Sequence, residues 1–167
     1  TYINGNDKYY YLSMITDAYS KKIMGYSLGE NMNVELVIKS LAMAFNNRQY
    51  NTKLIHHSDR GSQYCCKEYQ EKLRRMNVVT SMTENSDPYT NAIAERINGI
   101  IKQEFLLERR YHSLIELKTL IDQAVYAYNI LRPHLSCHML TPDKMHQQRR
   151  LRRKEYRNKF IDQKAKV

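Results

Sequence analysis

Two acidic side chains in this sequence are placed where they could hold divalent cations. Asp59 follows an expected short strand at residues 53–57, which carries Leu54 and Ile55, and precedes a glycine-containing turn; Glu95 lies inside a long helical pattern. Phosphodiester chemistry commonly uses two divalent cations about 3.5–4 Å apart. Mg²⁺ prefers oxygen ligands and typically takes one or two carboxylates together with phosphate and water. The candidate chemistry is therefore a pair of carboxylates on rigid elements, close to a surface that a nucleic acid can reach.

Each carboxylate also has a structural interpretation. A strand end beside a glycine-containing turn is where an α/β sheet presents functional groups, but an aspartate there can equally cap a nearby helix. A glutamate early in a helix is favoured by the helix dipole even when it only meets water. Glu95 lies off the apolar stripe that we expect from Ile93, Ile97, Ile100 and Ile101, next to polar or small residues: Asn91, Asn98, Gly99 and Lys102.

The elements that must position these residues begin with antiparallel strands. Residues 9–15 are aromatic and apolar and residues 22–28 alternate, which predicts two strands joined by a turn at 17–21. Residues 1–3, followed by Asn-Gly-Asn-Asp, read as the last part of a strand that enters a hairpin.

Helices and strands then alternate. Asn33 predicts the start of a helix, and a capping-box pattern at residues 113–116 predicts another, which Arg132-Pro133 closes. This order predicts the α/β class, with a mixed sheet of antiparallel hairpin strands followed by parallel strands and helices on its faces. The expected segments are helices at 33–46, 66–76, 90–107 and 113–131, and strands at 53–57 and 78–82.

The positive charge is concentrated at one end of the chain. Nine basic side chains against two acidic ones give residues 147–167 a charge of +7, out of +10 for all 167 residues. This segment predicts contact with a polyanion such as nucleic acid, although a solvated basic helix has the same composition. We expect no membrane span and no signal peptide, and the three cysteines, two of them adjacent, favour a reducing cytosol.

Two long motifs carry a resemblance to a known family. Residues 57–64 (HSDRGSQY) and 87–99 (DPYTNAIAERING) contain Asp59 and Glu95, with 35 residues between the two carboxylates. They resemble the central and final motifs of the integrase core of bacterial insertion-sequence transposases, the insertion sequence three family. That family belongs with the retroviral integrases to the DDE superfamily, which has the same D-35-E spacing. The likeness extends from the opening hairpin at residues 10–28 to an ending at 131–134 and 140–143.

The resemblance implies a fold and an activity. It implies a ribonuclease H-like catalytic core over residues 1–146 with an incomplete first strand, and a basic helical tail at 147–167. It implies a DDE-type polynucleotidyl transferase that cuts and joins DNA, with two Mg²⁺ (or Mn²⁺) ions held by Asp59, Glu95 and a third carboxylate. In the family that third residue is an aspartate of the first strand. Here its position falls two residues before Thr1, so we expect an N-terminally truncated chain without it.

The resemblance also implies partners. We expect DNA, both element ends and target, a homo-oligomer on that DNA, and a bacterial cytoplasmic, nucleoid-associated protein. The residues predicted to contact DNA are basic and lie beside the carboxylates or in the tail: Arg60, Arg96, Lys102, Arg149, Arg150, Arg152 and Arg153.

Other candidates receive a structural interpretation. Asp17 matches the turn after the second strand better than a metal ligand, and of His56 and His57 only one can point towards Asp59 because neighbouring strand residues face opposite ways. A zinc site at His134 and His138 is not expected, and the tyrosines are expected mainly in the core.

Two other functions stay open. The first is a catalytically dead transposase remnant that acts only in DNA binding or multimerisation, which the missing aspartate favours. The second is a related ribonuclease H-like nuclease, against which the spacing and the motifs argue.

Overall fold

A three-stranded antiparallel sheet forms the first part of the chain. The computed structural model describes residues 1–50, 52–83, 91–105, 111 and 113–148. The strands are β1 (Tyr2–Asn4), β2 (Tyr9–Thr16) and β3 (Ile23–Gly29), with β2 in the middle. Ile3 pairs with Tyr10 and Leu12 with Leu28, which confirms both predicted hairpins.

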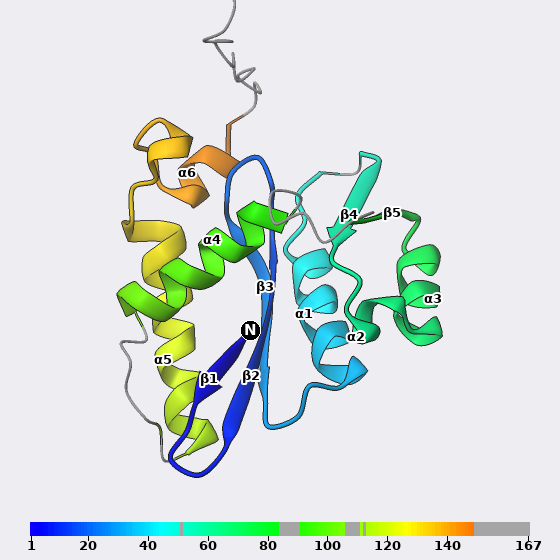
Figure 1. Ribbon diagram of the computed structural model, residues 1–167. Coiled ribbons are helices and arrows are strands. Elements are labelled where there is room, and N and C mark those ends of the chain that lie inside the picture. The colour runs from blue at the N-terminus through cyan, green and yellow to red at the C-terminus, as the bar shows by residue number, and fades with distance from the viewer. Residues whose placement is uncertain (51, 84–90, 106–110, 112, 149–167) are drawn as a thin grey trace, which may run out of the picture.

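Helix α1 (Val34–Asn46) covers one face of this sheet (Figure 1). Its predicted cap is confirmed, because the Asn33 side chain accepts a hydrogen bond from the backbone N–H of Leu36. The approach is so close that a Cβ on Gly25 would lie 2.1 Å from the carbonyl oxygen of Ser40. A glycine is therefore required where β3 meets α1.

A second sheet contains the two later strands. β4 (Leu54–Ser58) and β5 (Val78–Met82) pair in parallel, connected by a short helix α2 (Ser62–Cys65) that the sequence did not predict and by α3 (Lys67–Arg75). Both kinds of pairing are present as predicted, but in two sheets rather than one. No described strand joins the two sheets. The three residues of β1 pair with β2 alone, and β4 pairs only with β5.

The helices of residues 92–131 lie on the other face of the first sheet (Figure 1). The predicted long helix is α4 (Ala92–Ile100), which continues as a π-helical turn η2 (Ile101–Phe105). The capping-box helix is α5 (Leu114–Tyr126), continued by a second π-helical turn η3 (Ala127–Leu131). A 3₁₀ turn η4 (Leu135–Cys137) and a short helix α6 (Pro142–His146) follow.

Two apolar cores result from this arrangement. The alternation of β2 directs Tyr10 and Leu12 towards α4 and α5, where they pack with Ile97, Ile121 and Tyr128. The second core joins α1, α3 and the parallel strands through Val37, Leu41, Tyr69, Leu73 and Val78.

The apolar stripe predicted for α4 is wrong at one residue. Ile97, Ile100 and Ile101 are buried, but Ile93 is 39% exposed. It lies in the first turn, one turn before the part of α4 that meets the sheet and α5. No helix in the described part of the chain is long and apolar enough to cross a membrane.

Candidate active site

Asp59 lies directly after β4, in the turn that leads into α2. Its side chain is exposed, and its Oδ1 accepts a hydrogen bond of 3.0 Å from the backbone N–H of Gly61. The interpretation as a helix cap is wrong, because Gly61 is the N-cap residue of α2 and that cap has no side-chain hydrogen bond. The carboxylate instead stabilises its own turn, two residues on, and faces solvent.

Glu95 lies in the first turn of α4 and is also exposed. One turn further along the helix, a Cβ added to Gly99 would meet no atom within 4 Å. The surface beside Glu95 is therefore open, as the small and polar neighbours predicted. The helix-dipole interpretation of this glutamate is equally compatible with its position.

The start of β1 connects the two predicted motifs. Burial lowers the pKa of the Thr1 amino group; the charge of Lys102 lowers it further, and the charge of Asp59 opposes them. The charges of Asp59 and Lys102 therefore both act on the Thr1 amino group. The Lys102 ammonium lies 4.6 Å from the centre of the Tyr2 ring, in the same strand. Lys102 lies in η2, seven residues after Glu95, so the two side chains project from roughly the same side of the continuous helix that α4 and η2 form.

The predicted DNA-contacting residues divide into two groups. Arg60 and Arg96 are exposed, beside Asp59 and Glu95 in the chain, while Lys102 is half-buried against Tyr2. Arg149, Arg150, Arg152 and Arg153, with the rest of the predicted tail, lie outside the described residues.

Asp59 and Glu95 could supply some of the ligands of a hard cation. Within the described residues, no group of three or more His, Cys, Asp or Glu side chains is arranged to hold a metal ion. Asp59 and Glu95 nevertheless present exposed carboxylate oxygens, and Mg²⁺ commonly takes only one or two such ligands with water and phosphate. The residues present fit part of a magnesium site.

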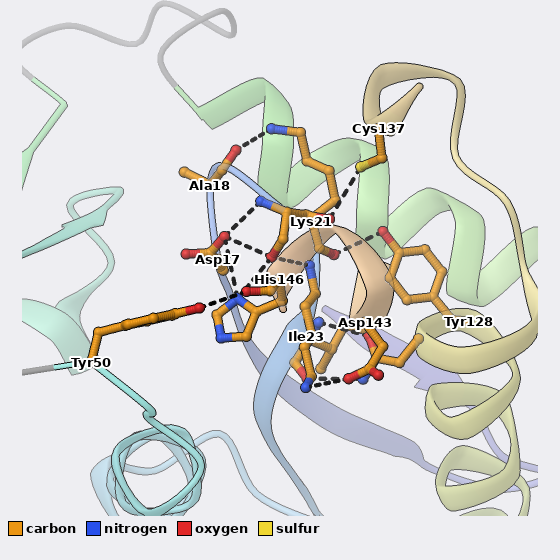
Figure 2. A network of polar contacts seen from close by, with 12 residues as sticks. Asp17, Ala18, Lys21, Ile23, Tyr50, Tyr128, Cys137, Asp143 and His146 are labelled. Atoms are coloured by element: carbon orange, nitrogen blue, oxygen red, sulfur yellow. Dashed lines mark hydrogen bonds and ion pairs between the residues drawn. The ribbon is translucent and has the colours of Figure 1, made fainter. Parts of the chain in front are cut away.

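Asp17 belongs to a different, closed network (Figure 2). Its Oδ1 accepts hydrogen bonds from the Ser20 backbone N–H (2.6 Å) and hydroxyl (2.7 Å), and the Nδ1 of His146 lies 3.8 Å away. Burial acts to raise the pKa of Asp17, but the neighbouring His146 and the Ser20 hydrogen bonds outweigh it and lower the pKa to about 2. Ser20 is fully buried, so these three residue types form no accessible nucleophile. The predicted turn role of Asp17 is confirmed.

The two neighbouring histidines of β4 point to different partners. The Nε2 of His56 lies 3.1 Å from the hydroxyl of Tyr69 in α3, and burial, then the charge of His57, lowers the pKa of His56 to about 4. The Nδ1 of His57 lies 3.0 Å from the hydroxyl of Ser81 in β5. Each imidazole therefore has a protein partner, as a structural role requires.

Sequence reasoning missed one polar contact near the candidate site. The guanidinium of Arg132 binds both oxygens of Glu104, with Nε 2.6 Å from Oε2 and Nη2 2.7 Å from Oε1. The two residues are 28 positions apart, so no local pattern could have paired them.

Comparison with known proteins identifies the family. A model of the integrase core domain matches residues 1–88, just over half of the chain, and a second integrase core domain model matches residues 76–142. These two matches together cover the strands β1 to β5, the turn of Asp59 and the helix of Glu95.

Curated relatives are similar over most of this chain. An uncharacterized 31 kDa protein of insertion element IS600 from Shigella sonnei is 35% identical over 152 residues, 88% of this chain and 56% of that protein. The transposase InsF of insertion sequence IS3fB from Escherichia coli K12 is 31% identical over 149 residues, 89% of this chain and 52% of that protein. The chain spans about half the length of these relatives.

Solved structures share the fold. The catalytic core domain of HTLV-2 integrase in complex with magnesium has a TM-score of 0.68 at 21% identity, and the match covers 87% of this chain and 90% of that one. A chain of the simian T-cell lymphotropic virus intasome, in complex with a PP2A regulatory subunit, has a TM-score of 0.75 at 20% identity, covering 92% and 54%. The fold is therefore ribonuclease H-like, as predicted. The chain belongs to the integrase core domain family, as a relative of the transposases of the insertion sequence three family.

Proposed function

We propose that this chain is the catalytic core of a transposase that cleaves DNA strands and transfers them, with Asp59 and Glu95 as ligands of two Mg²⁺ ions. The observation that carries the proposal is the position of the two carboxylates, since Asp59 is exposed at the end of β4 and Glu95 is exposed in the first turn of α4. Support also comes from the family and from the magnesium in the HTLV-2 integrase core.

The proposed role of each residue follows from its chemistry. Two bound Mg²⁺ ions would activate the attacking water or 3′-hydroxyl and stabilise the leaving oxygen. Asp59 and Glu95 supply the negative charge that holds such ions at the protein surface. Arg60, Arg96 and Lys102 bind phosphates on either side, so that the reacting phosphodiester is oriented along the face of α4.

The basic segment at 147–167 supplies most of the sequence-independent DNA affinity in this proposal. Each phosphate that a Lys or Arg neutralises adds about 0.9 to the slope of log affinity against log salt. Deleting residues 147–167 therefore reduces this slope by several units in a DNA-binding titration. An unchanged slope would contradict the role of the segment.

The proposal also covers the partners and the cellular location of the protein. The protein acts as a multimer on bacterial DNA, in the nucleoid; the intasome structure and the transposase names of the relatives support DNA as its partner. We place the core at residues 1–146, followed by the basic tail.

The test is removal of one carboxylate at a time. In the full-length transposase that carries this core, Asp59→Asn and Glu95→Gln each reduce strand transfer by at least a thousandfold while DNA binding persists, because the metal ligands are lost but the basic contacts stay. Glu35→Gln is the matched control, since Glu35 is also an exposed first-turn glutamate, in α1.

Two outcomes would contradict the assignment. Strand transfer within tenfold of wild type in either variant removes that residue from the metal site. DNA binding without any strand transfer in the wild-type protein instead supports a module that binds DNA or multimerises without catalysis.

A further inference from the structure

Two neighbouring helices each change from α-helical to π-helical winding at their C-terminal end. α4 passes into the π-helical turn η2 at Ile101, and α5 passes into η3 at Ala127. The two helices share one core, where Ile97, Ile100 and Ile101 pack with residues of α5. Single π-helical turns inside α-helices are rare and are frequent at functional sites.

An ion pair joins the two π-helical turns. Glu104 lies within η2, and Arg132 is the residue at which η3 ends. The contact is bidentate, and the third nitrogen, Nη1, donates to the carbonyl of Pro133 at 3.3 Å. The hydrogen bonds from Arg132 lower the pKa of Glu104, so the carboxylate is charged at neutral pH. Such a planar pair fixes orientation as well as distance.

The chain of α4 and η2 is attached on a second side. Lys102 contacts the Tyr2 ring of β1, while Glu104, two residues on, contacts the end of η3. Residues two apart point to nearly opposite sides of an α-helix, and they still do so in the wider π-helical turn. Two side-chain contacts on opposite sides of a helix restrain its rotation about its own axis. The rotation of this helix decides where the face of Glu95 and Lys102 points.

We infer that the Glu104–Arg132 ion pair is a positioning element, which sets the rotation of the helix formed by α4 and η2, and thereby holds Lys102 against Tyr2 of β1 and sets the direction of Glu95. The inference rests on the proposed function for the role of Glu95, but the rotation itself does not. Arg132 and Glu104 are positioning residues, since their charged groups are bound to each other.

The first readout is the position of Lys102. A cation over an aromatic ring has side-chain protons shifted upfield by the ring current, so the Lys102 methylene signals of the 167-residue chain report its contact with Tyr2. Glu104→Gln and Arg132→Ala lose this upfield shift. Arg132→Lys also loses it, because lysine keeps the charge but cannot form the bidentate pair.

The controls separate positioning from charge and from folding. Glu30→Gln breaks an exposed ion pair with Lys8 of similar length, 2.6 Å, and leaves the Lys102 signals unchanged. The exchanged pair Glu104→Arg with Arg132→Glu restores a large part of the shift. Thermal unfolding shows that each variant is folded; if Arg132→Ala is not, Glu104→Gln and Arg132→Lys decide. Lys102 signals identical to wild type in folded Glu104→Gln and Arg132→Lys overturn the inference.

The second readout is Mn²⁺ affinity, measured by electron paramagnetic resonance of the free ion. Asp59→Asn and Glu95→Gln weaken Mn²⁺ binding directly, with normal Lys102 signals. Glu104→Gln weakens it about tenfold, as loss of residues that orient metal ligands typically does. If Glu95→Gln leaves Mn²⁺ binding unchanged, the proposed function fails while the Lys102 readout still decides the rotation. If Glu95→Gln weakens binding but Glu104→Gln does not, the proposed function stands and the inference is overturned.

Discussion

The turns that contain Asp17 and Asp59 use the same side chain in opposite ways. Each aspartate accepts a backbone N–H from two or three residues further along the chain, so each stabilises its turn. Asp17 also binds the buried Ser20 hydroxyl and lies beside His146, whose side chain is only 8% exposed. Asp59 is exposed, and the Gly61 N–H is its one hydrogen bond in the described part of the chain.

The two aspartates differ in how their charge is used: the charge of Asp17 is bound within the fold, and the charge of Asp59 is open to a ligand. One partner of Asp17, His146, comes from α6, more than a hundred residues away, so the charge of Asp17 stabilises the tertiary fold. The charge of Asp59 stabilises little beyond its own turn and stays available to a cation or a substrate. The same contrast applies to two glycines: Gly25 is closed in by α1, and Gly99, near Glu95, faces open space.

Substitution of the two glycines is expected to have the largest effect on the free energy of unfolding. Gly25→Ala lowers the free energy of unfolding by about 3 kcal/mol or more, because its Cβ would overlap the backbone of Ser40 and Ala44. Gly99→Ala raises it by about 0.5–1 kcal/mol, since alanine favours the helix and nothing obstructs it. Urea unfolding measures both. Equal effects of the two substitutions would mean that the contrast between closed and open regions is wrong.

The two aspartates give the next effect. Asp17→Asn lowers the free energy of unfolding by about 1–2 kcal/mol; this is less than the full pKa shift implies, because the side chain is 34% exposed and water screens it. Asp59→Asn changes the free energy by less than about 0.5 kcal/mol. The comparison is made by urea unfolding at pH 7. A larger loss from Asp59→Asn than from Asp17→Asn would reverse the assignment of roles.

The loss of unfolding free energy caused by Asp17→Asn depends on pH in a defined direction. The pKa of Asp17 falls from 3.8 to about 2 on folding, so the charged carboxylate stabilises the folded state above about pH 4. This contribution decreases as the pH falls through the folded value and is absent below about pH 2. Urea unfolding of wild type and variant between pH 6 and pH 2 therefore shows two curves that converge in acid. Curves that stay parallel would mean that the charge of Asp17 is not responsible.

Local patterns predicted most of the elements but not their long-range contacts. The caps at Asn33 and Ser113 were predictable, because the side chain and the N–H that it accepts are three residues apart. The two π-helical turns were not, since an inserted residue leaves no local signature. The short helix α2 also escaped prediction, as its four residues are too few for an apolar period.

The candidate site shows the same division. The motifs around Asp59 and Glu95 were visible in the sequence, and the structure places both side chains at the surface. The contact of Lys102 with Tyr2 and the pairing of Glu104 with Arg132 depend on how a strand and two helices meet in space. Spacing alone does not encode such contacts.

The distribution of thiols has a practical consequence. Cys137 is buried, whereas Cys65 is exposed and Cys66 half-buried, and both follow Asp59 within seven residues. A maleimide dye added to the native protein will therefore attach beside the turn of Asp59, without engineered cysteines. Its fluorescence then reports on whatever approaches that turn.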